Sequence, residues 1–329
     1  MTQSQGLPEI SVVIPVRNGS RYLPGLFAAL DDQTLPDDRF EVILVDDGSV
    51  DGSRDLAGAW VRTHPMRRTL VEGEGRGPAH ARNLGIERAK GEWIASTDCD
   101  ITPSPGWLEM ALHATTDTGA EAVEGAIEPW PPNAADGPYS LVFSNEVGGR
   151  YNTGNMVYRR ELLLRLGGFD EGFAEQFLED SDLAFRILDA GFEIPFVPEM
   201  RVRHPVLNRS PIEAIHATRR LRWVSRFARK HPHRYWSELR PLVRPLSHVD
   251  IDVILALGAL IVIPKSKGAP RLALAVIAAN GFRRGIGSAH VFSAPPEQRA
   301  SRAFLSVAMP LAKTFWWLEG CVQFRKAVW

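Results

Sequence analysis

Short apolar runs alternate with segments of helical period along the first hundred residues. Residues 10–14, 40–45 and 93–97 are short, largely apolar stretches, which is typical of strands buried on both faces. Between them, residues 22–30 and 79–89 repeat apolar side chains at helical spacing. This alternation predicts an α/β fold, with a mostly parallel, doubly wound sheet flanked by helices.

The polar segments that follow the predicted strands hold the candidate chemistry. Asp46 and Asp47 follow residues 40–45, and Asp98 and Asp100 follow residues 93–97. Because parallel strands bind ligands at their carboxyl ends, we expect these side chains at one edge of the sheet. Strand alternation would send Asp98 and Asp100 to the same side, where two carboxylates suit a hard divalent cation. A polar turn that caps the next helix is the alternative.

Further elements are expected after residue 100. The pattern predicts a helix over 107–116, a Pro- and Gly-rich mobile loop over 128–150, and a strand over 151–158 interrupted by Gly154. A helix over 176–189 begins with several acids, which favour the helix dipole. One or two strands over 192–202 complete this part of the chain.

Charge divides the chain into two unlike parts. The net charge of the 329 residues is −1, but residues 1–200 carry 16 Lys/Arg against 33 Asp/Glu, and residues 201–329 carry 22 against 6. A basic second part predicts contact with an anionic membrane or with nucleic acid. Nothing before it resembles a nucleic-acid reader, so we predict a membrane surface and no nucleic acid. Cys99 and Cys321 form no disulfide or metal pattern, and the first residues are polar, so we expect a cytoplasmic location.

The second part also has an amphipathic character. Residues 201–244 interleave Arg and His with aromatic residues at helical spacing, which predicts a basic amphipathic helix of the kind that binds a membrane surface. Three apolar runs, 253–264, 272–282 and 303–318, fall short of the roughly 20 residues that a spanning helix needs. Together with Trp316, Trp317 and Trp329 they favour interfacial or re-entrant helices. A soluble helical subdomain is the alternative.

Seven short motifs occur in an order that resembles a known family. Residues 9–205 resemble the family 2 inverting glycosyltransferases, which have the nucleotide-sugar-binding GT-A fold. The resemblance implies a Rossmann-like catalytic domain over 1–205 and an α-helical region over 206–329. The motifs are Ser11–Asn18, Val45–Ser49, Gly77–Gly85, Asp98–Asp100, Gly154-Asn155, Gly167–Asp170 and Glu179–Asp182.

The resemblance also implies a reaction and its residues. A hexose-type sugar would move from a nucleoside-diphosphate-sugar to an acceptor hydroxyl with inversion, and Asp180 would be the general base. Acceptor positioning would fall to Glu179, Asp182 and Asn155, although acids in a first helical turn also serve the helix dipole. The nucleotide would contact Pro15, Arg17, Asp46, Asp47, Arg82 and Asp98. A divalent metal, Mn²⁺ or Mg²⁺, would be held by Asp98, Asp100 and His204.

The same residues indicate which substrates the protein would take and which other functions would fit. The carboxylates of Asp46 and Asp47, after the second strand, can only accept hydrogen bonds. One of them can accept the imide N–H of uracil, which favours a UDP-sugar. The basic region favours a glycan or lipid-linked acceptor in cell-envelope synthesis, with the protein peripheral or monotopic at the cytoplasmic face of the inner membrane. A sugar-phosphate nucleotidyltransferase is one alternative. Such an enzyme would need a basic, glycine-rich loop after the first strand, and residues 15–19 match that loop poorly. A non-catalytic carbohydrate- or membrane-surface-binding protein is another, but it would not need both Asp180 and the Asp98/Asp100 pair.

Overall fold

The computed structural model describes residues 6–64, 67–132, 140–239, 247–262, 275, 278–285 and 296–324. The chain divides into two compact units. Unit 1 comprises Met1–Ala134 and Val142–Val206, and unit 2 comprises Ala135–Leu141 and Leu207–Trp329.

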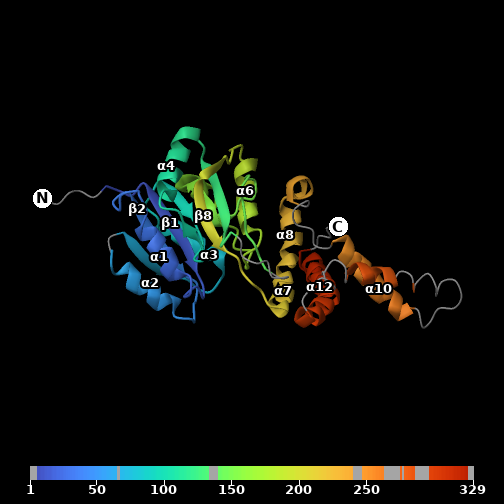
Figure 1. Ribbon diagram of the computed structural model, residues 1–329. Coiled ribbons are helices and arrows are strands. Elements are labelled where there is room, and N and C mark those ends of the chain that lie inside the picture. The colour runs from blue at the N-terminus through green and yellow to red at the C-terminus, as the bar shows by residue number, and fades with distance from the viewer. Residues whose placement is uncertain are drawn as a thin grey trace. The chain divides into compact units, whose positions relative to one another are not determined.

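Unit 1 is built on an eight-stranded sheet in the order β3-β2-β1-β4-β7-β6-β8-β5. Figure 1 shows this sheet with β1, β2 and β8 labelled. Strands β7 and β5 run antiparallel to their neighbours, and the other pairings are parallel. The carboxyl ends of β1, β2, β3, β4, β6 and β8 therefore lie at one edge, and the predicted mostly parallel α/β sheet is confirmed. The strands are β1 Ile10–Val16, β2 Phe40–Asp46, β3 Arg68–Glu72, β4 Trp93–Ser96, β5 Thr102–Pro103, β6 Ala122–Trp130, β7 Met156–Arg159 and β8 Phe196–Pro205.

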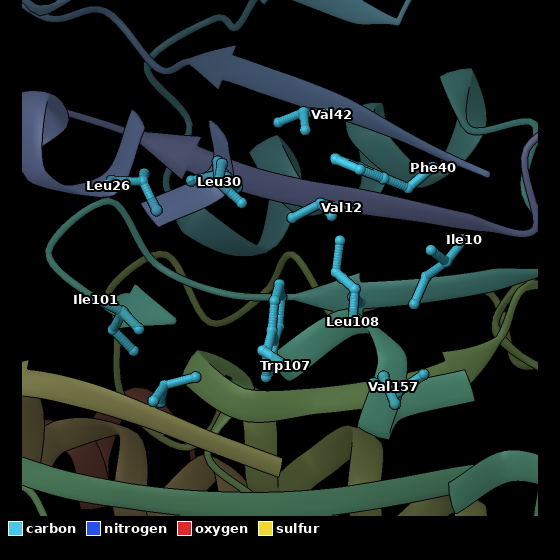
Figure 2. Packing of buried hydrophobic residues seen from close by; sticks show 14 of the residues in the cluster. Ile10, Val12, Leu26, Leu30, Phe40, Val42, Ile101, Trp107, Leu108 and Val157 are labelled. Atoms are coloured by element: carbon cyan, nitrogen blue, oxygen red, sulfur yellow. The ribbon is translucent and has the colours of Figure 1, made fainter. Parts of the chain in front are cut away.

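Helices cover both faces of this sheet, because neighbouring residues of a strand point to opposite sides. Val12 packs with α1, α2 and α4, in a core that includes Leu26 and Trp107 (Figure 2). Val13 packs on the other face with α3, α5 and α6. Burial on both faces explains the largely apolar runs of the central strands. The helices are α1 Leu23–Asp31, α2 Ser53–Val61, α3 Pro78–Arg88, α4 Trp107–Thr118, α5 Arg160–Leu166 and α6 Glu179–Asp189.

Three local predictions need correction. Strand β4 ends at Ser96, and the backbone N–H of Ile101 donates to the carbonyl of Asp98 at 3.1 Å, so Asp98 and Asp100 lie in a turn and strand alternation does not apply to them. The predicted mobile loop overlaps β6, which continues to Trp130, and part of that loop, residues 133–139, lies outside the described residues. The predicted strand over 151–158 begins only at Met156, after the 3₁₀ turn η1 Thr153–Asn155.

Unit 2 is helical in its described residues. The long helix α12 Pro296–Gln323 packs along η2 and against α7, α8 and α10. Its glycine Gly320 meets the backbone of Arg222, and a Cβ at this position would collide with it. The other elements are α7 Pro211–Ala217, η2 Thr218–Arg222, α8 Trp223–Lys230, α9 Pro232–Arg234, η3 Tyr235–Leu239 and α10 His248–Val262.

The basic segment differs from the single amphipathic helix that the sequence predicts. It is divided into short helices, and the side chains of Trp223, Phe227 and Tyr235 are buried. Of the helices that the structure describes, none combines the length and the apolar character needed to cross a bilayer. Residue Trp329 and most of the run 272–282 lie outside the described residues.

Candidate active site

The ends of β1 and β2 bring four predicted nucleotide-binding residues together. Pro15 pairs with Val45 and Val16 with Asp46, so Arg17 and Asp47 follow at the ends of neighbouring parallel strands. The Arg17 side chain is more than half exposed, and its Nη1 lies 3.6 Å from Asp47 Oδ2. Asp46 is buried beside them and accepts a hydrogen bond from the backbone N–H of Ser49 at 3.4 Å.

Asp47 fastens the glycine-rich loop to this edge. Its buried carboxylate accepts the backbone N–H of Arg76 at 3.1 Å and that of Gly77 at 2.8 Å. Gly77 has φ +101°, and a Cβ there would lie 2.6 Å from the carbonyl oxygen of Ala174, so only glycine fits. The loop therefore closes tightly over the ends of β2 and β3.

Arg82 connects the turn after β4 to the first turn of α6. Its side chain is completely buried, with Nη2 2.6 Å from Asp98 Oδ1 and Nη1 3.2 Å from Glu179 Oε1. Burial opposes the charge, but Asp98 and Glu179 outweigh it and raise the pKa of Arg82 above its ordinary value. Arg82 has no exposed surface and its terminal nitrogens bind two carboxylates; its contact with a nucleotide stays a prediction.

Glu179 and Asp180 are two adjacent carboxyl groups with raised pKa values. Burial and the charge of Asp180 raise the pKa of Glu179 to about 7, although Arg82 opposes the shift. Burial raises the pKa of Asp180 to about 6, although the backbone N–H of Ser181 and the Arg82 charge oppose it. Ser181 N–H donates to Asp180 Oδ1 at 2.7 Å, and Asn152 Nδ2 lies 3.5 Å from Asp180 Oδ2. Asp180 is partly exposed, so it can accept a proton from a bound molecule near neutral pH.

Asp100 and His204 form a second, separate pair. His204 Nε2 lies 3.5 Å from Asp100 Oδ2, and His204 Nδ1 lies 2.7 Å from the carbonyl oxygen of Pro205. Because a carbonyl only accepts, we assign a proton to Nδ1, and Nε2 is then the ring nitrogen that faces Asp100. Burial and the nearby Asp98 raise the pKa of Asp100, and His204 opposes the shift.

This pair has the chemistry of a partial metal site. A carboxylate oxygen and an imidazole nitrogen are both metal ligands, and a ligating histidine commonly donates its other N–H to a backbone carbonyl. Asp98 does not join them, because Arg82 binds its Oδ1 and Gln176 Nε2 lies 3.4 Å from its Oδ2. Among the residues that the structure describes, no three His, Cys, Asp or Glu side chains are grouped to hold a metal. The pair fits a cation that takes its remaining ligands from phosphate and water.

Asn155 and Asp182 occupy structural positions. Asn155 is fully buried; its Nδ2 donates to carbonyls of β6 and β8 at 2.8 Å, and its Oδ1 accepts from Trp107 Nε1 at 2.8 Å. Asp182 is also fully buried and binds Arg186 Nε at 2.9 Å. Arg186 in turn donates to two carbonyls at the end of α5. Both side chains thus support the surrounding backbone, and their role toward an acceptor stays a prediction.

Four residues of this region were not predicted from the sequence: Glu124, Asn152, Gln176 and Ser181. For Glu124 a signal exists, because it is the one acid inside the apolar run 122–127. The contacts of Asn152 and Gln176 depend on how separate loops meet, and no local pattern announces them.

Comparison with known sequences identifies relatives of this chain. Residues 11–168 match the family model described as glycosyl transferase family 2. The chain is 29% identical to the glycosyltransferase AglE of Haloferax volcanii, over 60% of this chain and 67% of that protein. It is also 29% identical to the pre-mycofactocin glycosyltransferase of Mycobacterium tuberculosis, over 84% of this chain but only 57% of that longer protein.

Comparison with solved structures identifies the fold. The mannosyltransferase PcManGT from Pyrobaculum calidifontis, solved with GDP-Man and Mn²⁺, is similar with a TM-score of 0.62 at 23% identity, over 95% of this chain and 88% of that one. Staphylococcus aureus TarS 1–349, solved with UDP, is similar with a TM-score of 0.52 at 15% identity, over 94% and 92% of the two chains. These similarities confirm the predicted GT-A fold.

Proposed function

The chain belongs to glycosyl transferase family 2, and we propose that it transfers a hexose from a nucleoside-diphosphate-sugar to an acceptor hydroxyl with inversion. That the chain is a glycosyltransferase follows from the family match and the GT-A fold. The details of the reaction rest on the residues at the carboxyl edge of the sheet.

Asp180 is the observation that carries the proposal. As the acceptor oxygen bonds to the anomeric carbon, its proton passes to the Asp180 carboxylate, and the bond to the diphosphate breaks on the opposite face. A single displacement of this kind inverts the anomeric configuration and needs no carboxylate nucleophile. A pKa of about 6 leaves Asp180 largely ionised at neutral pH, yet basic enough to take the proton.

The donor would bind along the ends of β1 and β2. Arg17 is exposed at this edge and can pair with a phosphate, and Asp46 can accept hydrogen bonds from the nucleoside. Asp47 would act indirectly, because it holds the glycine-rich loop. We retain UDP as the favoured nucleotide; one fold relative was solved with UDP and another with GDP-Man.

Asp100 and His204 would hold a divalent cation, Mn²⁺ or Mg²⁺. When bound, such a cation supplies charge neutralisation for the departing diphosphate. Asp98 would contribute by fixing Arg82, and Arg82 would fix Glu179 beside the base. Through Arg82, the turn that carries Asp98 would thus be held at a fixed distance from the helix that carries Asp180.

Unit 2 would bring the enzyme to a membrane surface. Helix α12 exposes Phe304, Leu311, Phe315, Leu318 and Val322, whose spacing of three, four or seven residues puts them on one face. The surrounding chain is strongly basic, which favours anionic lipid. This supports a peripheral position at the cytoplasmic face of the inner membrane and a glycan or lipid-linked acceptor of the cell envelope.

A donor panel tests the proposal. UDP- and GDP-sugars are incubated with the protein and Mn²⁺, and release of the nucleoside diphosphate is followed with and without a glycan or lipid-linked acceptor. We expect release from one donor class that needs the metal and is lost in Asp100→Ala. Binding of a nucleotide without turnover of any donor would favour a non-catalytic carbohydrate-binding protein instead.

A further inference from the structure

Glu124 is a buried carboxylate whose partners all come from one loop. It lies on β6 with 1% of its surface exposed. Its Oε2 accepts the backbone N–H of Gly149 at 2.6 Å, and its Oε1 accepts that of Arg150 at 3.0 Å and also that of Tyr151. Asn145 Nδ2 donates to the same Oε1 at 2.9 Å. Three successive backbone N–H groups therefore converge on one side chain.

The conformation of this loop needs such an anchor. Gly148 and Gly149 have φ of +78° and +76°, and Tyr151 has φ +55°, which is unfavourable for a residue with a side chain. Hydrogen bonds to an ionised acceptor are stronger than neutral ones, so the Glu124 carboxylate can hold a backbone path that the loop would otherwise leave. Successive backbone N–H groups that point the same way commonly bind an anion, and here the Glu124 carboxylate is that anion.

The loop leads directly to the candidate base. Asn152 follows Tyr151, and its Nδ2 lies 3.5 Å from Asp180 Oδ2. The Tyr151 ring meets the ring of Phe185, on the same helix as Asp180, edge to face with centroids 6.3 Å apart. Contacts from Glu124 thus continue through residues 149–151 to the helix and the carboxylate that would receive the proton.

We propose that Glu124 is a positioning residue of the transfer reaction. It fixes the loop 148–152 so that the Asn152 amide stays against Asp180 and orients its carboxylate. That Glu124 holds the loop follows from the hydrogen bonds alone. That this orients Asp180 for the reaction rests on the proposed function.

The first experiment needs no substrate. In Glu124→Gln an amide replaces the carboxylate, so the side chain loses its charge and one of its acceptor oxygens. Glu41→Gln is the matched control, because Glu41 is also a strand glutamate, 6% exposed, that accepts a backbone N–H from Lys90 at 2.7 Å and a hydroxyl from Ser11 at 2.7 Å. Hydrogen exchange by mass spectrometry should speed up for residues 148–152 by at least about tenfold in Glu124→Gln and not in Glu41→Gln. Unchanged exchange in this loop would overturn the proposal, whether or not a donor is known.

The second experiment separates positioning from general loss of structure. With the donor found by the panel, Glu124→Gln should lower kcat roughly ten- to hundredfold while the KM for donor changes little, because the base and not the donor site is displaced. Asn152→Ala should lower kcat similarly, and the double variant should be no worse than either single one. The positioning role would be contradicted if the losses in kcat of the two single variants added fully in the double variant. It would also be contradicted if Glu124→Gln kept a normal kcat while hydrogen exchange of residues 148–152 became faster. Absence of turnover in the unaltered protein would instead count against the proposed function, and hydrogen exchange would still decide whether Glu124 holds the loop.

Discussion

Arg82 and Glu179 form an enclosed ion pair, with Nη1 3.2 Å from Oε1 and both side chains almost completely buried. The other arm of Arg82 binds Asp98, so one guanidinium joins the turn after β4 to the helix that carries the candidate base. Removal of a partner from a buried ion pair leaves uncompensated charge in the interior, which is costly.

Arg82→Met should therefore destabilise the protein strongly. We expect a loss of about 3–5 kcal/mol in the free energy of unfolding, measured by chemical denaturation. Arg39→Met is the control, because Arg39 pairs with Glu9 at the surface, where the side chains are 42% and 49% exposed. Removal of such an exposed pair should cost at most about 1 kcal/mol. Equal losses in the two variants would show that the Arg82 bridge is not important for stability.

Stability should depend on pH through Glu179. Its pKa rises from an ordinary 4.5 to about 7 in the folded protein, so the folded state binds more protons than the unfolded state between these values. The contribution is then fully present below about pH 4.5 and is lost as the pH rises through about 7. In Glu179→Gln the fall in unfolding free energy from pH 5 to pH 7.5 should be smaller than in the unaltered protein. Parallel pH profiles for the two proteins would contradict the assignment.

Activity should follow the ionisation of Asp180. Because a general base must be ionised, kcat/KM should rise as the pH increases through about 6, the pKa of Asp180, and then level off. Glu179 adjoins it, so the profile reports the pair as a unit. An activity that falls across pH 5–7 would show that a protonated group, rather than this carboxylate, controls the reaction.

Metal binding should depend on His204. A nucleoside diphosphate with Mn²⁺ should raise the melting temperature of the unaltered protein by mass action, and His204→Ala should lose the part of the shift that requires Mn²⁺. His113→Ala is the control, because His113 is exposed on the helix α4. A metal-dependent shift retained in His204→Ala would remove this histidine from the site.

Vesicle binding should depend on the apolar face of α12. Phe315 is 61% exposed there, and Phe315→Glu should weaken sedimentation with vesicles that contain anionic lipid. Val50→Glu is the control, because Val50 is 90% exposed on unit 1. Equal binding by both variants would argue against this face as the membrane contact.

The sequence predicts the sheet well because its strands are buried on both faces and leave short, largely apolar runs, as residues 10–14 and 40–45 do. The positions of Asp46, Asp47 and Asp180 follow from strand ends and from a helix start, which are local features. The two partners of Arg82 could not be predicted from local features. Nothing in the sequence of a helix that follows a glycine loop indicates that its arginine is enclosed between Asp98 and Glu179. At Asp98–Asp100 the preferred strand geometry was wrong and the turn, named only as the alternative, is what forms, because β4 ends two residues before the acidic pair begins.

The basic segment illustrates a different limit. Aromatic residues at helical spacing beside arginines fit a membrane helix and a packed helix equally well, and tertiary contacts decide between them. Trp223 and Phe227 are buried inside unit 2 rather than presented to solvent. The exposed apolar face belongs instead to α12, where the sequence shows Lys313 and Glu319 among the apolar residues.

The most direct test of the account is the product configuration and its dependence on Asp180. The donor identified by the panel is incubated with acceptor and Mn²⁺, and the anomeric configuration of the new bond is read by proton NMR for the unaltered protein and for Asp180→Asn. We predict a product inverted relative to the donor, and a turnover in Asp180→Asn lowered by at least about a hundredfold with donor binding retained. A retained configuration, or normal turnover in Asp180→Asn, would contradict a single displacement in which Asp180 is the base.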